Sequence, residues 1–236
     1  MDLVVPHRRP GPLVPAALVD RPNRFLGIVR LADGREVEAH IGDRGRLEEV
    51  LRPGAEVLLA PAASPTRRTA FTLVCARTAQ GVLVSIDPAN ANRLVRALLE
   101  ARLLDLPPYG AIAQEVRVGS SRFDFALALD DGRRMLLEVK SAGVVRDGLA
   151  LFPDAPSERA ARHCRELAEL ARTGEPAAVV LVAQRGDARA IGPHPVDPGF
   201  ARALAEAAQD GVLLRGAAFE VGREGFRFLG SIPVRL

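Results

Sequence analysis

The stretch that decides the fold is "RFDFALALDDGRRMLLEVKS", residues 122–141, which reads as two strands joined by a turn. Apolar side chains occupy every odd position from 123 to 129, and Asp124 lies between them on the opposite face. Residues 135–140 alternate in the same way, with Glu138 and Lys140 on one face. Because residues two apart share a strand face, the pattern predicts a hairpin whose charged groups point to the same side.

The length of the turn sets which residues stand opposite each other. A two-residue turn would place Asp124 opposite Val139, which mismatches polar and apolar faces, so the register excludes it. A three-residue loop at 130–132, with its glycine in the left-handed position, places Asp124 opposite Glu138. A five-residue loop with the same centre gives the same pairing, and a centre shifted by one residue places Asp124 opposite Lys140. In each case the three charged groups cluster.

Two carboxylates on opposed strand positions have Cβ atoms about 5 Å apart, and at an effective dielectric of about 20 they repel by roughly 3 kcal/mol. A divalent cation would compensate that repulsion. Oxygen ligands from Asp124, Glu138 and a backbone carbonyl, that of Val139, suit Mg²⁺ or Mn²⁺. Lys140 would then orient or activate a water and stabilise charge at a reacting phosphorus. The alternative is that Glu138 and Lys140 form a surface ion pair on an edge strand.

Lys140 is the only lysine in a chain with 32 basic residues. Overall composition explains why arginine is used at the other basic positions. Lysine is nevertheless kept at position 140. A compact ammonium can do proton and charge work near a water that a broad, permanently charged guanidinium does poorly. The solitary lysine therefore supports a catalytic site at this hairpin.

The composition, 236 residues with 48 % hydrophobic and 26 % charged residues, is that of an ordinary globular protein. No apolar run reaches the ~20 residues of a membrane span and the N-terminus lacks the pattern of a signal peptide, so we expect a cytoplasmic protein without a membrane partner. Cys75 and Cys164 lack the spacing of a zinc site or disulfide framework, and we expect both to be buried. The net charge of +3 comes entirely from residues 1–86, a mild bias toward polyanions.

The chain divides by pattern into two parts. Residues 1–86 show about five short strand candidates, with a hairpin signal at Asp33-Gly34, and this arrangement fits an OB-like β-barrel, with a sandwich as the alternative. Residues 87–236 alternate helices and strands, which predicts a mixed α/β sheet flanked by helices. The helices are expected at 89–106, 157–174 and 197–211, and the strands at 113–118, 122–129, 135–140, 177–184, 212–221 and 226–235.

Several stretches in the same order resemble the sugar fermentation stimulation protein (SfsA) family. They are "RFLGIVRLADGREVEAH", "RPGAEV", "NRLV", "EVRVGSSRFDFAL", "LLEVKS", "LFPDAPSERAARHCRELAEL", "VAQRGD" and "DPGFARALAEAAQDGV". The resemblance covers most of the chain, and it is specific because "SRFDF", "EVKS" and "FPDAPSER" occur together.

The resemblance implies an OB-like nucleic-acid-binding domain at 1–86 and a PD-(D/E)XK restriction-endonuclease-like domain at 87–236. It implies DNA rather than RNA as the partner, and Mg²⁺- or Mn²⁺-dependent phosphodiester hydrolysis. Asp124 and Glu138 would hold the metal, Lys140 would be the catalytic lysine, and Glu115 would be a further ligand or base, or else only a polar strand residue. The side chains that we expect to contact nucleic acid are Arg24, Arg46, Arg67, Arg68, Arg93, Arg122, Arg159 and His163.

Arg159 and His163 are four residues apart and therefore share a helix face, where they would contact phosphate or simply face solvent. The sequence departs from the family pattern after His40 and around "SPTRRTAFTL", both in the expected DNA-binding part. The two aromatic residues of residues 1–86, Phe25 and Phe71, lie in strand-like runs, where we expect them to pack in the core rather than to stack on bases.

Three functions compete at this point. The first is a metal-dependent nuclease acting on DNA or RNA. The second is a DNA-binding regulatory protein of the sugar-metabolism type that keeps a nuclease-like fold without cleaving, and the third is an RNA-binding accessory module, which the scarcity of aromatics disfavours. The paired acids favour the nuclease, because a purely binding domain does not need to hold them together. The sequence shows no dimer interface and leaves a homodimer open.

Overall fold

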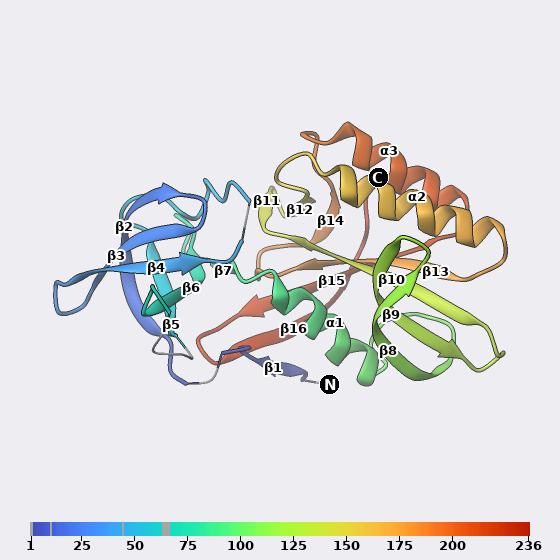
Figure 1. Cartoon of the computed structure of the whole chain (residues 1–236), viewed down its shortest axis with the longest axis horizontal. Coiled ribbons are helices and arrows are strands. Elements are labelled where there is room, and N and C mark those ends of the chain that lie inside the picture. The colour runs from blue at the N-terminus through green and yellow to red at the C-terminus, as the bar shows by residue number, and fades with distance from the viewer. Residues whose placement is uncertain (1, 10, 44, 63–66) are drawn as a thin grey trace. The chain divides into compact units, whose positions relative to one another are not determined.

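The computed structural model describes residues 2–9, 11–43, 45–62 and 67–236, and the chain forms two compact units (Figure 1). The first unit takes in residues up to 90 together with 184–187 and 219–229, and the second unit takes in the remainder. Since later segments return to the first unit, the division of the chain at residue 86 into separately folding domains stays a prediction.

The first unit is built on a small barrel. Its strands are β2 (Val14–Asn23), β3 (Leu26–Leu31), β4 (Glu36–Ile41), β5 (Glu56–Pro61), β6 (Phe71–Arg77) and β7 (Leu83–Ser85). They form a sheet of order β4-β3-β2-β5-β6-β7, and an additional parallel pairing of β4 with β6 closes five of them into a barrel. The closure confirms the OB-like barrel and excludes the sandwich.

The barrel owes its shape to the alternation and turns of its strands. The predicted hairpin at Asp33-Gly34 joins β3 to β4, with Gly34 at φ +85°, a conformation that suits glycine. Inward-facing residues such as Leu18, Val29 and Leu73 are fully buried and fill the barrel, as the strand period requires.

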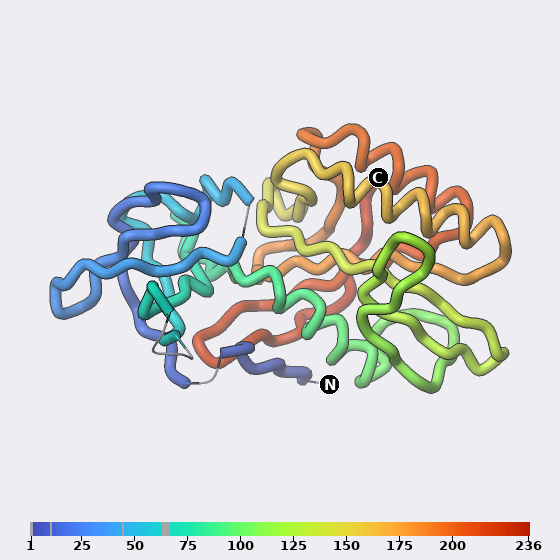
Figure 2. Tube along the Cα trace, viewed as in Figure 1, coloured from blue at the N-terminus to red at the C-terminus, as the bar shows by residue number. Residues whose placement is uncertain are grey.

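A seven-stranded mixed sheet carries the candidate site. Its order is β1-β16-β15-β13-β10-β9-β8, in which β10, β13 and β15 run parallel and β8, β9 and β10 form an antiparallel meander (Figure 2). The strands are β1 (Val4–Pro6), β8 (Tyr109–Val118), β9 (Ser121–Leu129), β10 (Arg134–Ala142), β13 (Ala177–Ala183), β15 (Leu213–Val221) and β16 (Gly225–Ile232). β15 and β16 contribute residues to both units.

Three helices accompany the sheet. α2 spans Glu158–Arg172 and α3 Pro198–Gln209, close to the predicted positions, whereas α1 spans Ala89–Glu100 and ends before the predicted residue 106. Ser157 caps α2 by accepting a hydrogen bond from the Ala160 N–H, and Asp197 caps α3 in the same way from Phe200. α2 and α3 lie side by side and pack apolar side chains against the central strands (Figure 1).

The structure contains elements that the sequence pattern did not predict. β11 (Val144–Arg146), β12 (Leu149–Phe152) and β14 (Ala190–Pro193) form a separate three-stranded sheet, and β1 joins the main sheet beside β16. None exceeds four residues, which is too short for a period of two to be recognised. Cys75 and Cys164 are buried free thiols, as predicted, and burial raises the pKa of each to about 12. None of the helices in the described ranges is long and apolar enough to cross a membrane.

Candidate metal centre and nucleic-acid contacts

The β9–β10 hairpin has the register that the three-residue loop predicts. The Leu129 N–H donates to the Arg133 carbonyl at 2.8 Å, and Gly132 adopts φ +86°. Pairing runs inward from this turn to Leu137 opposite Phe125. Continued by one position, this register would set Asp124 opposite Glu138, and the two acids come from neighbouring strands of one sheet.

β10 is a central strand, flanked by β9 on one side and β13 on the other. Glu138 and Lys140 are 3 % and 8 % exposed, and Nζ of Lys140 contacts Oε1 of Glu138. The alternative of a surface ion pair on an edge strand is therefore wrong. Charged side chains in such positions are retained only when they are paired or functional, because burying a charge is costly.

The two oxygens of Glu138 differ sharply in their surroundings. Oε1 contacts the Lys140 ammonium, and Nδ1 of His163 lies 2.7 Å from the same oxygen. Oε2 is buried and has no hydrogen-bond partner among the described residues. Burial by itself would raise the pKa of Glu138, but the hydrogen bond from His163 and the charge of Lys140 outweigh it, and the pKa lies below its ordinary value.

Asp124 is held by two donors. Its Oδ1 accepts from Nδ2 of Asn92, on α1, at 2.7 Å, and its Oδ2 accepts from the Val139 N–H, also at 2.7 Å. Burial, and then the negative charge of Glu138, raise the pKa of Asp124 despite these hydrogen bonds. Two acids whose environments push their pKa values in opposite directions are a common feature of active sites.

The donors at this point fit a hard divalent cation. The N–H and C=O of one strand residue point to the same neighbouring strand, so the Val139 carbonyl faces β9, as its N–H does. Two carboxylates, one with a spare buried oxygen, and a backbone carbonyl supply the oxygen ligands that Mg²⁺ and Mn²⁺ prefer. Within the described part of the chain, no three His, Cys, Asp or Glu side chains converge on one metal position, so water or substrate oxygens would complete the coordination.

His163 does not lie where the sequence placed it. Its ring is 2 % exposed, stands against Glu138, and lies 5.6 Å from the ring of Phe123 between centroids. The expectation of an open phosphate-contacting face shared with Arg159 is corrected, because α2 turns His163 into the core while Arg159 stays exposed. The period of four put both residues on one face but could not tell how far around the helix the buried face extends.

Glu115 and Arg122 pair with each other. The Glu115 carboxylate lies 2.8 Å from Nε of Arg122, and both side chains are about half exposed. Glu115 has a left-handed backbone conformation at φ +55°, which interrupts the alternation along β8. We therefore leave Glu115 out of the metal centre.

The predicted arginine contacts divide between the two units. Arg24, Arg46 and Arg68 are exposed on the first unit, where Arg67 is half-buried. Arg93, half-buried, and Arg122 and Arg159, both exposed, belong to the second unit.

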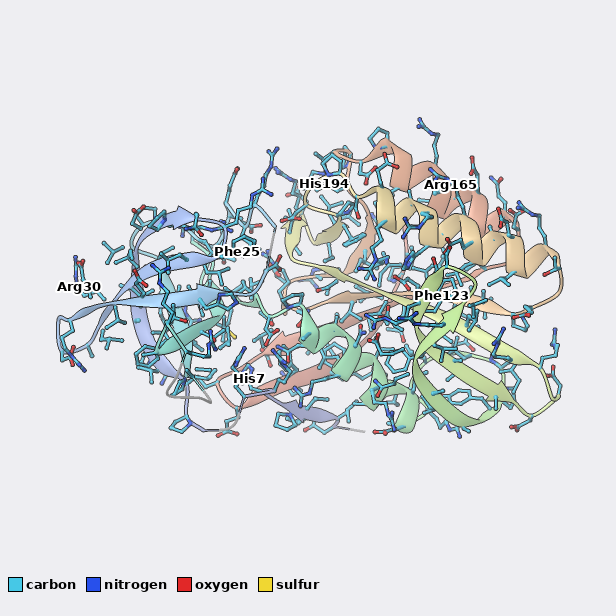
Figure 3. All side chains as sticks on the ribbon, in the orientation of Figure 1. His7, Phe25, Arg30, Phe123, Arg165 and His194 are labelled. Carbon is cyan, nitrogen blue, oxygen red and sulfur yellow. The ribbon has the colours of Figure 1, made fainter. Side chains whose placement is uncertain are left out.

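The two aromatics of the barrel have different environments. Phe71 packs against the barrel core as expected, whereas Phe25 is 50 % exposed in the turn between β2 and β3 (Figure 3). The core role expected for Phe25 is wrong because this residue falls just before β3, outside the alternating strand.

Sequence patterns missed Asn92 of the candidate site and assigned His163 to the wrong contact. Asn92 orients Asp124, and His163 contacts Glu138 rather than solvent. Each is one of several polar residues on its helix, and such residues are usually solvated. Tertiary packing decides which of them reaches a carboxylate.

Comparison with known proteins identifies the family. Residues 19–86 match the model of the SfsA N-terminal OB domain, and residues 89–225 match that of the sugar fermentation stimulation protein RE domain. A sugar fermentation stimulation protein homolog from Moorella thermoacetica is 46 % identical over 206 residues (86 % of this chain, 88 % of that protein), and one from Chloroflexus aurantiacus is 42 % identical over 234 residues (98 % and 88 %). The structure of Pyrococcus furiosus SfsA in complex with Ca²⁺ superposes with a TM-score of 0.85 at 32 % identity, covering 98 % of this chain and all of that one. The chain therefore belongs to the sugar fermentation stimulation protein (SfsA) family, with an N-terminal OB domain followed by the RE domain of that family.

Proposed function

We propose that this protein is a divalent-cation-dependent nuclease that hydrolyses phosphodiester bonds of nucleic acid at Asp124, Glu138 and Lys140. The observation that carries the proposal is the burial of Glu138 and Lys140 together on a central strand next to the strand of Asp124, with no hydrogen-bond partner for Oε2 of Glu138 among the residues that the structure describes. A strand that served only to stabilise the sheet would gain more from apolar residues at these positions.

Each residue of the centre has a separate task. Asn92 and the Val139 N–H hold the Asp124 carboxylate in one orientation, and His163 does the same for Glu138. The Lys140 ammonium, at the end of the same face, is suited to stabilise the negative charge that develops around phosphorus during attack. Because all these groups are fixed by regular structure, little reorganisation accompanies the reaction.

A cation would be held by Asp124, Glu138 and the Val139 carbonyl, where it would supply Lewis-acid polarisation of the phosphate and a more acidic attacking water. The Ca²⁺ of the Pyrococcus furiosus SfsA structure supports a divalent cation in this family member as well. Mg²⁺ or Mn²⁺ is our proposal for activity, since both accept oxygen ligands and leave positions for substrate.

The substrate would be gripped mainly through its phosphates. Exposed arginines on the first unit, among them Arg24, Arg46 and Arg68, provide backbone contacts that do not read sequence. Phe25, half-exposed in the β2–β3 turn, offers a surface for stacking on an unpaired base. We take DNA as the expected substrate and RNA as the comparison.

The test is a cleavage assay on circular DNA, linear DNA and RNA with Mg²⁺ or Mn²⁺, repeated in EDTA. Lys140→Ala should abolish metal-dependent cutting. Arg162→Ala is the matched control, because it also removes one positive charge, from an exposed ion pair with Glu166 on α2, and it should cut like the parent. Thermal melting of all three proteins separates loss of chemistry from loss of fold.

The outcomes separate the two leading functions. Metal-dependent cutting that disappears in Lys140→Ala and persists in Arg162→Ala supports the nuclease. If no substrate is cut under any metal while DNA binding is retained, the nuclease proposal fails, and a non-catalytic DNA-binding protein with a nuclease-like fold takes its place.

A further inference from the structure

A polar cavity lies within the first unit, built entirely from residues of that unit. It has a volume of about 230 Å³, large enough for a phosphate group with part of its substituent. Its polar lining comes from Arg8, Arg9, His40, Thr72 and Asp87, and backbone around Gly42 and Ala89 completes the wall. The barrel strands β4 and β6 supply His40 and Thr72, and these strands are paired with each other, His40 directly opposite Thr72.

The cavity has a positive charge excess. Arg8 and Arg9 line it, and Arg67 reaches its wall by donating to Oγ1 of Thr72 at 2.9 Å. Asp87 is the one acid in the lining, and it is engaged by Arg8 through Nε at 3.2 Å and Nη2 at 3.1 Å. Three guanidinium groups against one carboxylate leave the equivalent of two positive charges around the cavity.

Two donors at the cavity remain available for a ligand. Nε of Arg9 is buried and has no hydrogen-bond partner among the described residues. Thr72 is 2 % exposed, and its hydroxyl oxygen accepts from Arg67, which leaves its own proton to donate. An unpartnered buried donor is costly, and an anion in the cavity would satisfy it.

We propose that this cavity, lined by Arg8, Arg9, His40 and Thr72 with Arg67 bonded to Thr72 beside it, is a phosphate-binding site that holds a phosphate group of a nucleic-acid strand on the barrel. Arg9 supplies the main charge, Thr72 supplies a neutral donor, and Asp87 holds Arg8 in place at the rim. The identification of the strand as nucleic acid rests on the proposed function, whereas the binding of a phosphate group does not.

The state of His40 agrees with such a site. Burial, together with the positive charges of Arg67 and Arg9, lowers the pKa of His40, although a hydrogen bond to the Phe25 carbonyl acts in the opposite sense. Phosphate bound among these groups would cancel part of the repulsion and raise the pKa of His40. The imidazole thus reports on occupancy of the cavity.

The experiment measures binding of fluorescent single-stranded DNA in EDTA, so that no cleavage intervenes. It compares the parent, Arg9→Gln and the control Arg30→Gln, which removes an equal charge from the β3–β4 hairpin at an exposed pair with Glu36 (Figure 3). Arg9→Gln should weaken binding about 10-fold and reduce the slope of log affinity against log salt by ~0.7. Arg30→Gln should change affinity by less than about 2-fold, as expected for an exposed ion pair.

Three ligand arms identify the source of the phosphate. A 5′-phosphorylated strand that binds more tightly than its 5′-hydroxyl counterpart, only when Arg9 is present, assigns the cavity to a terminal phosphate. Equal binding of both strands, weakened equally by Arg9→Gln, assigns it to a backbone phosphate. In the third arm, inorganic phosphate should raise the pKa of His40, followed by NMR, in the parent and not in Arg9→Gln.

The proposal is overturned if Arg9→Gln matches Arg30→Gln in affinity and salt slope, and inorganic phosphate leaves His40 unchanged in the parent. If Arg9→Gln does not fold, Arg9→Lys replaces it in the binding assay. The change in the pKa of His40 when inorganic phosphate is added to the parent then decides whether the cavity binds phosphate. Cleavage is measured separately, so phosphate binding without any nuclease activity would retain this inference and reject only the proposed function.

Discussion

Nδ1 of His163 lies 2.7 Å from Oε1 of Glu138, the same oxygen that the Lys140 ammonium contacts. One oxygen of Glu138 is thus contacted by two groups of the protein, and the other has no hydrogen-bond partner in the described part of the chain. α2 brings His163 to this position from outside the sheet, so the helix orients a carboxylate that belongs to a strand.

Loss of the His163 contact should impair cleavage more than stability. His163→Leu removes the donor and should reduce metal-dependent cleavage by about 10- to 100-fold, the usual effect of losing a group that orients a metal ligand. His163→Asn places a side-chain N–H near the position of Nδ1 and should lose less. Cleavage rates measured against Mg²⁺ concentration, beside melting curves, distinguish the two variants. Equal losses in both would contradict an orienting hydrogen bond.

Lys140→Arg should fold and lose cleavage by about 100-fold or more, the scale of effect expected for a group that works on protons and charge in the transition state. A guanidinium is broader than an ammonium and cannot occupy the same buried space beside Glu138. The measurement is single-turnover cleavage with the parent and Arg162→Lys as the surface control. Cleavage by Lys140→Arg at the parental rate would show that this lysine has no special task.

Asp124→Asn should stabilise the protein in EDTA while removing metal binding. The pKa of Asp124 is raised in the folded state by burial and by Glu138, so the folded protein binds the proton more tightly than the unfolded chain does. This group therefore favours folding at low pH, and that contribution is lost as pH rises through the raised pKa.

The Asp124→Asn variant lacks this pH-dependent loss. We expect its free energy of unfolding to exceed that of the parent by about 0.5–2 kcal/mol at neutral pH, the range for substitutions that relieve a functional site, and the difference to shrink below pH 4. Urea unfolding at both pH values measures it. Added Mn²⁺ should stabilise the parent and leave the variant unchanged; a variant less stable than the parent at neutral pH would refute the prediction.

Asp187→Asn should destabilise the first unit strongly. Asp187 binds the 2 % exposed side chain of Arg185 through two hydrogen bonds, of 2.6 and 2.7 Å, and Arg185 also contacts Glu49 at 3.2 Å. Removing the Asp187 charge leaves a buried guanidinium underpaired, which costs about 3 kcal/mol.

A matched control for Asp187→Asn exists on the surface. Asp131 pairs with Arg133 at the same spacing of two residues, but both side chains are about half exposed. Asp131→Asn should therefore change the free energy of unfolding by less than 1 kcal/mol. Urea titrations of both variants measure the two changes in the free energy of unfolding. Similar decreases in both variants would show that burial does not set how much these ion pairs stabilise the protein.

The hairpin and the pairing of Asp124 with Glu138 could be predicted because they depend on local rules. Strand alternation has a period of two, and the position of Gly132 determines the turn, so the register followed from residues close in the chain. The positions of the helices followed from the local sequence pattern for the same reason. The solitary Lys140 could be assigned to the site because it shares a strand face with Glu138.

Only the tertiary structure decided which other side chains contact these residues. His163 and Asn92 reach the carboxylates from helices distant in sequence, and β13 covers the side of β10 that an edge strand would expose. The cavity around Arg9 likewise joins the N-terminal segment to two barrel strands. Local pattern specifies which face a side chain occupies, whereas burial, pKa and partnership depend on long-range packing, which periodicity does not encode.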